Sequence, residues 1–126
     1  MMRNITKHIV HCSDSTHGDV AEIRRWHLER GWRDVGYHFI IRRDGEVEVG
    51  RPVNEAGAHC QGFNAESIGT CLVGKDTFTP EQFIALKRLH RGLKEQFPRV
   101  QLFGHCELNT QGKTCPNFDV HEVLGE

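Results

Sequence analysis

The chain has 126 residues and a formal net charge of -1, and 26% of its residues are charged. This length predicts a single domain spanning residues 1–126, with a core large enough to fold without disulfides or a metal. The composition excludes an intrinsically disordered chain, and the absence of a strong basic excess argues against nucleic acid as the main partner.

The first half of the chain predicts three strands and one helix. A strand is expected at residues 5–12, with His8-Ile9-Val10 at its centre. A helix follows, which begins with a capping box at Asp19 and ends at Gly31. Two further strands are joined by an Asp-Gly turn that is typical of hairpins, at residues 37–42 and 46–51.

The second half adds two strands and two helices. The stretch 52–66 is irregular in pattern, and a mostly apolar, central strand is expected at 67–74. A second capping box opens a helix at Thr79, which Pro98 ends. The remaining predicted elements are a strand at 100–105, a loop at 106–115 and a short helix from about Asp119. This order predicts an α/β fold with a central mixed sheet flanked by helices.

Three features of the sequence bear on location. The longest apolar run has four residues, Phe83 to Leu86, whereas a transmembrane helix needs about 20. The first residues lack the apolar segment of a secretory signal. The odd number of cysteines, five, suits a reducing compartment better than a disulfide scaffold. We therefore expect synthesis in the cytoplasm and no membrane insertion.

Histidine and cysteine residues indicate a metal site. The chain has nine histidines, and His11, His105 and Cys115 lie at or just after predicted strand ends, where α/β sheets place ligands. Catalytic zinc takes three protein ligands, including mixed Cys and His sets. Because neighbouring strand residues point to opposite faces, Cys12 and Cys106 are expected to point away from the histidines that precede them.

Several short motifs follow one another between residues 9 and 119. They are Ile9-Val10-His11-Cys12-Ser13, Ile23-Arg24-Arg25-Trp26-His27, Gly31-Trp32, residues 34–41, Asp44-Gly45, Gly50-Arg51, Gly57-Ala58-His59, Asn64, Ser67-Ile68-Gly69, Gly104-His105 and residues 113–119. In this order they resemble the zinc-dependent N-acetylmuramoyl-L-alanine amidases, the family that includes small phage lysozymes of amidase type and the peptidoglycan recognition proteins. The resemblance is nearest to the phage lysozyme-like members.

The resemblance implies a zinc hydrolase that cleaves the amide bond between N-acetylmuramic acid and L-alanine in peptidoglycan. It implies one zinc ion per chain, bound by the three residues named above. It also implies that Tyr37 and Lys113 are catalytic and that His59 lies near the substrate. The loop before Cys115 is longer than in the phage members, which leaves the placement of Lys113 open, although the Lys-x-Cys spacing is kept.

The implied residue types suit this chemistry. Zinc lowers the pKa of a water molecule to about 7, which supplies hydroxide at neutral pH. Lys113 could stabilise the oxyanion, and Tyr37 could move or orient the proton that the leaving amine needs. The alternative interpretations are structural: a packed aromatic side chain for Tyr37, a solvated loop charge for Lys113 and a loop-carbonyl contact for His59.

The resemblance leaves other functions open. The expected role is a monomeric phage or prophage endolysin that acts on the cell wall after release, although a secreted effector would have a similar sequence. Some members of the family bind the wall without cutting it, and the presence of Tyr37 and Cys115 argues against that role here. Some phage members also bind and inhibit a phage RNA polymerase, so a polymerase is a possible second partner.

Overall fold

The computed structural model describes residues 3–32, 34–108, 112 and 114–126. Its elements, in chain order, are β1 (Lys7–Cys12), α1 (Val20–Glu29), β2 (Phe39–Ile41), β3 (Val47–Val49), the 3-10 helix η1 (Asn64–Glu66), β4 (Ser67–Leu72), α2 (Pro80–Gln96), β5 (Gln101–Gly104), the 3-10 helix η2 (His105–Glu107) and α3 (Val120–Leu124). The predicted order of strands and helices is confirmed, with two short 3-10 helices in addition.

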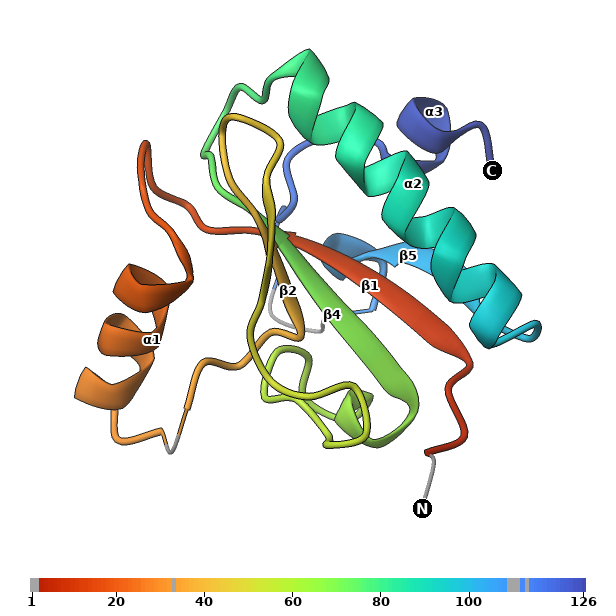
Figure 1. Ribbon diagram of the computed structural model, residues 1–126, viewed down its shortest axis with the longest axis horizontal. Helices are drawn as coiled ribbons and strands as arrows, with labels where there is room; N and C mark the ends of the chain where they lie inside the picture. Colours follow the sequence, from red (N-terminus) through yellow and green to blue (C-terminus); the bar gives the residue numbers. More distant parts are fainter. Residues whose placement is uncertain (1–2, 33, 109–111, 113) are drawn as a thin grey trace.

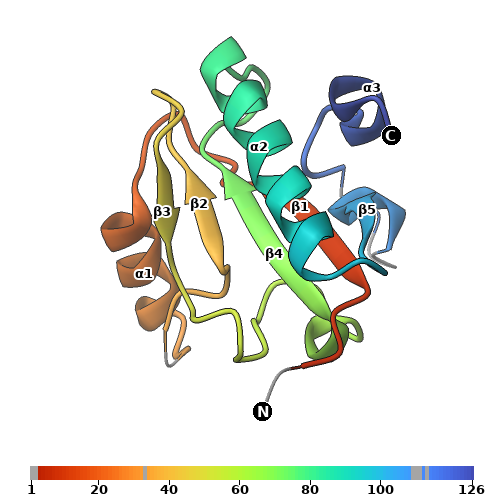
Figure 2. The same cartoon turned by 45° about the vertical axis from the view of Figure 1, so that its right-hand side comes forward.

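The strands form one mixed sheet in the order β3-β2-β4-β1-β5 (Figure 2). β4 lies at the centre, as predicted, and pairs in parallel with β1 and β2. β5 adds in parallel to β1, whereas β3 returns antiparallel to β2 as the second strand of the hairpin. Because β1 and β5 run the same way side by side, the residues that follow them meet at one edge of the sheet.

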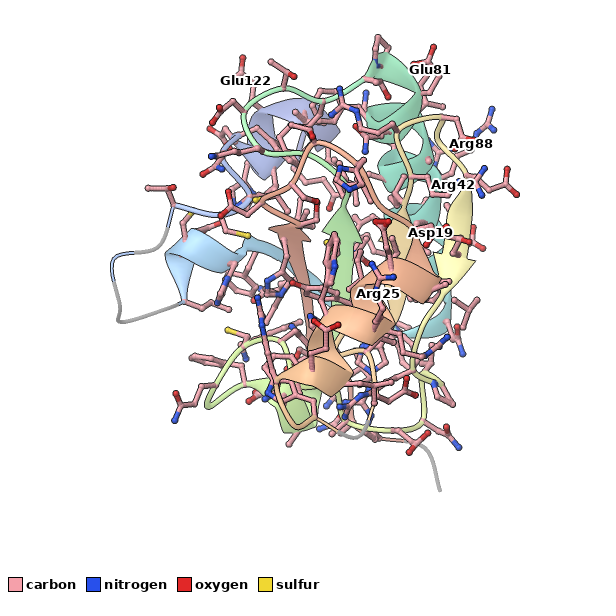
Figure 3. The ribbon with its side chains drawn as sticks, turned by 90° about the vertical axis from the view of Figure 1, so that its left-hand side faces the viewer. Asp19, Arg25, Arg42, Glu81, Arg88 and Glu122 are labelled. Atoms are coloured by element: carbon pink, nitrogen blue, oxygen red, sulfur yellow. The ribbon has the colours of Figure 1, made fainter. Side chains whose placement is uncertain are left out.

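The two faces of the sheet are covered by different helices (Figure 1). On one face, Leu86 of α2 and a valine of α3 pack against Val10 of β1. On the other face, Ile23 of α1 packs against Ile40 and Cys71. Figure 3 views the molecule from this second side, with Asp19 and Arg25 marking α1 in front of the strands. Because side chains alternate along each strand, they pack into two separate layers, one on each face of the sheet.

The helix starts follow from local capping signals. The Asp19 carboxylate accepts a hydrogen bond from the Glu22 N–H at 2.9 Å and caps α1. Thr79 and Gln82 form the full predicted capping box at α2, with a proline at its first position. The Asp119 side chain caps α3. These caps satisfy backbone N–H groups that have no partner within the helix.

The strands are shorter than predicted, and two residues of the site lie outside them. Tyr37 precedes β2, although its carbonyl still accepts from the Arg51 N–H at 2.9 Å. His105 opens η2 instead of ending a strand, because the Glu107 carboxylate accepts from the Gly104 N–H at 2.8 Å and the chain turns there. The alternation of side chains in a strand therefore applies to His11 but not to His105, which lies in a 3-10 helix.

Within the described residues, no helix combines the length and the apolar content that crossing a membrane requires.

Candidate metal centre

Three predicted ligands converge at one edge of the sheet. His11 lies in β1 one residue beyond Val10, whose register partner in β5 is Gly104, and His105 follows that glycine directly. The two imidazole centroids lie 4.4 Å apart. Together with the sulfur of Cys115, the candidate ligand atoms all lie within 4.8 Å of one another. The parallel pairing of β1 with β5 is what brings the two histidines together.

Backbone contacts place Cys115 against both histidine-bearing segments. The Cys12 N–H donates to the Cys115 sulfur at 2.9 Å. The Cys106 N–H donates to the Cys115 carbonyl at 2.7 Å. The segment before α3 is therefore fastened to the end of β1 and to η2, and its thiol faces the histidines.

The donor set suits zinc. Two imidazoles and one thiolate match the mixed Cys and His ligand sets of catalytic zinc, which leave a fourth position for water or substrate. His11 is only 2% exposed, so the site is shielded on the β1 side. The hydrogen bond with the Cys12 thiol and the burial of the sulfur raise the pKa of the Cys115 thiol above its ordinary value. A metal ion would therefore have to displace a proton from Cys115 on binding.

The two neighbouring cysteines lie outside this cluster. Cys106 is exposed to solvent, which agrees with its predicted direction although it lies in η2 and not in a strand. Cys12 is buried beside Cys115, and its sulfur accepts a hydrogen bond from the Asn117 amide at 3.7 Å. Cys12 thus contacts one candidate ligand without belonging to the group whose ligand atoms converge.

A cleft of about 480 Å³ opens onto the candidate ligands. Tyr37 lines it, and its ring lies 5.1 Å from that of His11, centroid to centroid. Burial raises the pKa of the Tyr37 hydroxyl well above its ordinary value, so the group is protonated at neutral pH and can donate a hydrogen bond. Trp32 and His27 line the same cleft, and their ring centroids lie 4.4 Å apart. Lys113, the other predicted catalytic residue, lies outside the described residues.

His59 also lines the cleft, but its ring is held by protein groups. Its Nδ1 lies 2.8 Å from Nε2 of His11, and its Nε2 lies 3.1 Å from the Ser67 hydroxyl. Burial lowers the pKa of His59 well below its ordinary value, which keeps the ring neutral at pH 7. Sequence reasoning placed His59 near the substrate and did not predict its contact with His11. The sequence signal for His59 was the Gly57-Ala58-His59 motif. This motif indicates the contact with His11 only once the close approach of the backbone to the ring is known.

Other histidines and cysteines prove structural. His27 accepts a hydrogen bond from the Gly36 N–H at 2.8 Å and so supports the backbone beside the cleft. His8 and His90 form a buried pair with their Nδ1 atoms 2.9 Å apart. Cys71 is buried in β4. Cys60 is also buried, at 2% exposed, although it lies in a loop, and its N–H donates to the Asn64 side-chain oxygen.

Known proteins resemble this chain in sequence and in fold. A family model described as N-acetylmuramoyl-L-alanine amidase matches residues 1–118. The endolysin of Klebsiella phage KP32 is 46% identical, over 88% of this chain and 80% of that protein. The solved structure of N-acetylmuramoyl-L-alanine amidase LysC from Clostridium intestinale is 31% identical, with a TM-score of 0.90 over 98% of this chain and 85% of that chain. Drosophila PGRP-LB has a TM-score of 0.84 and 26% identity, over 99% of this chain and 82% of that chain.

Proposed function

Because the chain belongs to the N-acetylmuramoyl-L-alanine amidase family, we infer that it is an endolysin-type hydrolase that cuts bacterial peptidoglycan. The bond cleaved joins the lactyl group of N-acetylmuramic acid to the L-alanine of the stem peptide. Water adds its oxygen to the carbonyl, which leaves a lactyl carboxylate and a free amino group on L-alanine. The observation that carries this proposal is the convergence of two histidines and a cysteine on a cleft in a chain of this family.

We propose that the centre holds one zinc ion per chain. His11, His105 and Cys115 would be its ligands, since their donor atoms lie together and suit that metal. When bound, zinc would polarise the amide carbonyl and lower the pKa of a water molecule, so that hydroxide is available near neutral pH. Cys12 would support the thiolate through its backbone N–H, because a hydrogen bond donated to sulfur favours the charged form.

Tyr37 and Lys113 are the proposed catalytic residues. Tyr37 lines the cleft and its hydroxyl is protonated, so it is suited to donate a hydrogen bond to the carbonyl oxygen as negative charge develops there. It could also orient the proton that the leaving amine requires. Lys113 would add a positive charge to the same oxyanion, on the evidence of the resemblance and its Lys-x-Cys spacing.

The decisive experiment identifies the bond that is cut. Purified peptidoglycan is digested with the zinc-loaded protein, and the products are analysed by mass spectrometry. We expect intact glycan strands and released stem peptides with a free L-alanine N-terminus. Reducing sugar ends or cleaved peptide bonds would contradict the proposal, and binding without any released product would indicate a non-catalytic wall-binding protein.

A matched pair of cysteine variants connects the activity to the metal centre. Cys115→Ser should remove a zinc ligand and abolish release of stem peptides. Cys106→Ser changes an exposed thiol outside the cluster and should leave the rate unchanged. The predicted polymerase partner and monomeric state stay predictions, which a pull-down with a phage RNA polymerase and size-exclusion chromatography would test.

A further inference from the structure

The side chain of His59 is fixed at every polar atom. Its two ring nitrogens lie within hydrogen-bond distance of His11 and of the Ser67 hydroxyl, and its backbone N–H donates to the Asn64 amide oxygen at 3.0 Å. The residue is 9% exposed. Both ring nitrogens of His59 are therefore engaged by neighbouring side chains.

Two glycines make room for this ring. A Cβ atom at Gly69 would lie 2.6 Å from the His59 ring, and one at Gly57 would lie 2.7 Å from its Cδ2 atom. Real Cβ atoms do not approach other heavy atoms so closely, so a larger residue at Gly69 would force the His59 ring to shift, and one at Gly57 would clash with both that ring and the Gly36 carbonyl. The Gly57-Ala58-His59 motif and the Gly69 backbone of β4 therefore form a slot for one imidazole.

The direction of the hydrogen bonds decides which nitrogen of His11 can hold a metal. If His11 donates from Nε2 to His59, then His59 donates to Ser67, and the Nδ1 atom of His11 carries a lone pair that can ligate zinc. In the reverse direction, Ser67 donates to His59 and His59 donates to His11, and a neutral His11 would then carry its proton on Nδ1. Zinc binding is compatible only with the first direction, in which His11 is the donor.

We propose that His59, anchored on Ser67, is a positioning residue that fixes the tautomer and the ring plane of His11 and so selects Nδ1 as the zinc-ligating atom. This role rests on the proposed zinc site and differs from direct contact with the substrate. A hydrogen bond from the second nitrogen of a metal-bound histidine orients the ring, and its loss commonly costs 10- to 100-fold in metal affinity.

Zinc affinity of purified variants, measured by competition with a chromogenic chelator, tests the role without relying on activity. We expect His59→Phe to raise the zinc Kd roughly 10- to 100-fold and Ser67→Ala to raise it less, since His59 can still accept from His11. His59→Asn places an amide oxygen, which can accept from His11, near the position of Nδ1. Its zinc Kd should therefore lie closer to that of the parent chain than to that of His59→Phe. His90→Gln, at a buried histidine on the other face of the sheet, is the matched control and should leave the Kd unchanged.

A measurement on the unmodified chain keeps the proposal testable if His59→Phe fails to fold. In the chain loaded with cadmium-113 and labelled with nitrogen-15 at histidine, NMR should show cadmium coupling to Nδ1 of His11 and a proton on Nε2. Coupling to Nε2 would overturn the proposal, as would an unchanged Kd in a folded His59→Phe variant. If no coupling to His11 appears at either nitrogen, the zinc site itself is wrong, which is a different failure.

Discussion

Single residues of this site act through short contacts between segments that are distant in the sequence. His11 contacts His59 across 48 positions, and the backbone at Cys12 contacts Cys115 across 103. Each contact gives a candidate ligand a partner that restricts its orientation. The expected effects of substitutions therefore differ according to whether a residue ligates, orients or reacts.

Tyr37→Phe separates chemistry from metal binding. The substitution keeps the ring beside His11 but removes the hydroxyl that would donate to the developing oxyanion. We expect the rate of stem-peptide release to fall roughly 100-fold, the usual scale for removing one such donor, with zinc content unchanged. Binding to insoluble peptidoglycan should change much less, because transition-state stabilisation and uniform binding are separable. A normal rate for this variant would remove Tyr37 from the mechanism.

Zinc affinity should rise with pH. The pKa of the Cys115 thiol is raised in the metal-free chain, so the thiol is protonated at pH 7 and zinc must displace its proton. Displacement of one proton makes the zinc Kd fall about tenfold for each unit of pH. Competition titrations at pH 7 and pH 8 measure this dependence directly. A Kd that does not change with pH would mean that Cys115 is not a ligand or is already ionised.

At the scale of the elements, helix starts were predictable, and so was the end of β1 at Cys12, whereas the end of β5 was not. The start of α2 is determined by Thr79, Pro80 and Gln82, which act within one turn of each other. The end of β5 depends on Glu107, whose carboxylate turns the chain after Gly104, and no periodicity in the strand reveals that contact. Local signals can be recognised in the sequence, whereas a side chain that ends a strand is recognised only in the fold.

The cap of α2 should carry a measurable share of the stability. Thr79→Ala removes the acceptor for the Gln82 N–H at 3.1 Å and the donor to the Arg43 carbonyl at 2.8 Å. We expect the free energy of unfolding to fall by about 1 to 2 kcal/mol, as for other lost caps. Urea denaturation measures the change. Thr77→Ala, at an exposed position nearby, is the control and should lie within about 0.5 kcal/mol of the parent chain.

At the scale of the whole molecule, the candidate ligands lie outside the apolar core, although Tyr37 packs against it. The clusters centred on Leu86, Leu93 and Ile40 contain none of the candidate ligands. The length of the chain and its apolar pattern predicted this core, and the resemblance predicted the ligands. The slot for His59 was not predicted, because it depends on how close the backbone at Gly57 and Gly69 approaches the ring.

Removing the metal should therefore abolish activity and leave the fold intact. We expect circular dichroism spectra at 25 °C to be the same with and without a chelator, since the core does not depend on the ligands. The melting temperature should fall after chelation, because zinc that binds only the folded chain stabilises it by mass action. Loss of secondary structure on chelation would show that the metal also holds the fold together.

The buried histidines should make the metal-free chain sensitive to acid. The pKa of His8 is lowered to about 3 by burial and by the neighbouring His90, so the unfolded chain takes up a proton that the folded chain refuses. The stability that depends on neutral His8 is complete above pH 6.5 and is lost as the pH falls from 6.5 towards 3. Between pH 7 and pH 5 this single group should cost about 2 kcal/mol of unfolding free energy.

Urea denaturation of His8→Gln at the two pH values isolates that contribution. The variant should lose about 2 kcal/mol less than the parent chain between pH 7 and pH 5, whatever its stability at pH 7. Thr70→Val removes the hydroxyl that lies 2.8 Å from Nε2 of His8 but keeps the histidine, so it should be less stable at both pH values and retain the full acid dependence. Equal acid dependence in His8→Gln and the parent chain would show that His8 does not stay neutral in the folded protein.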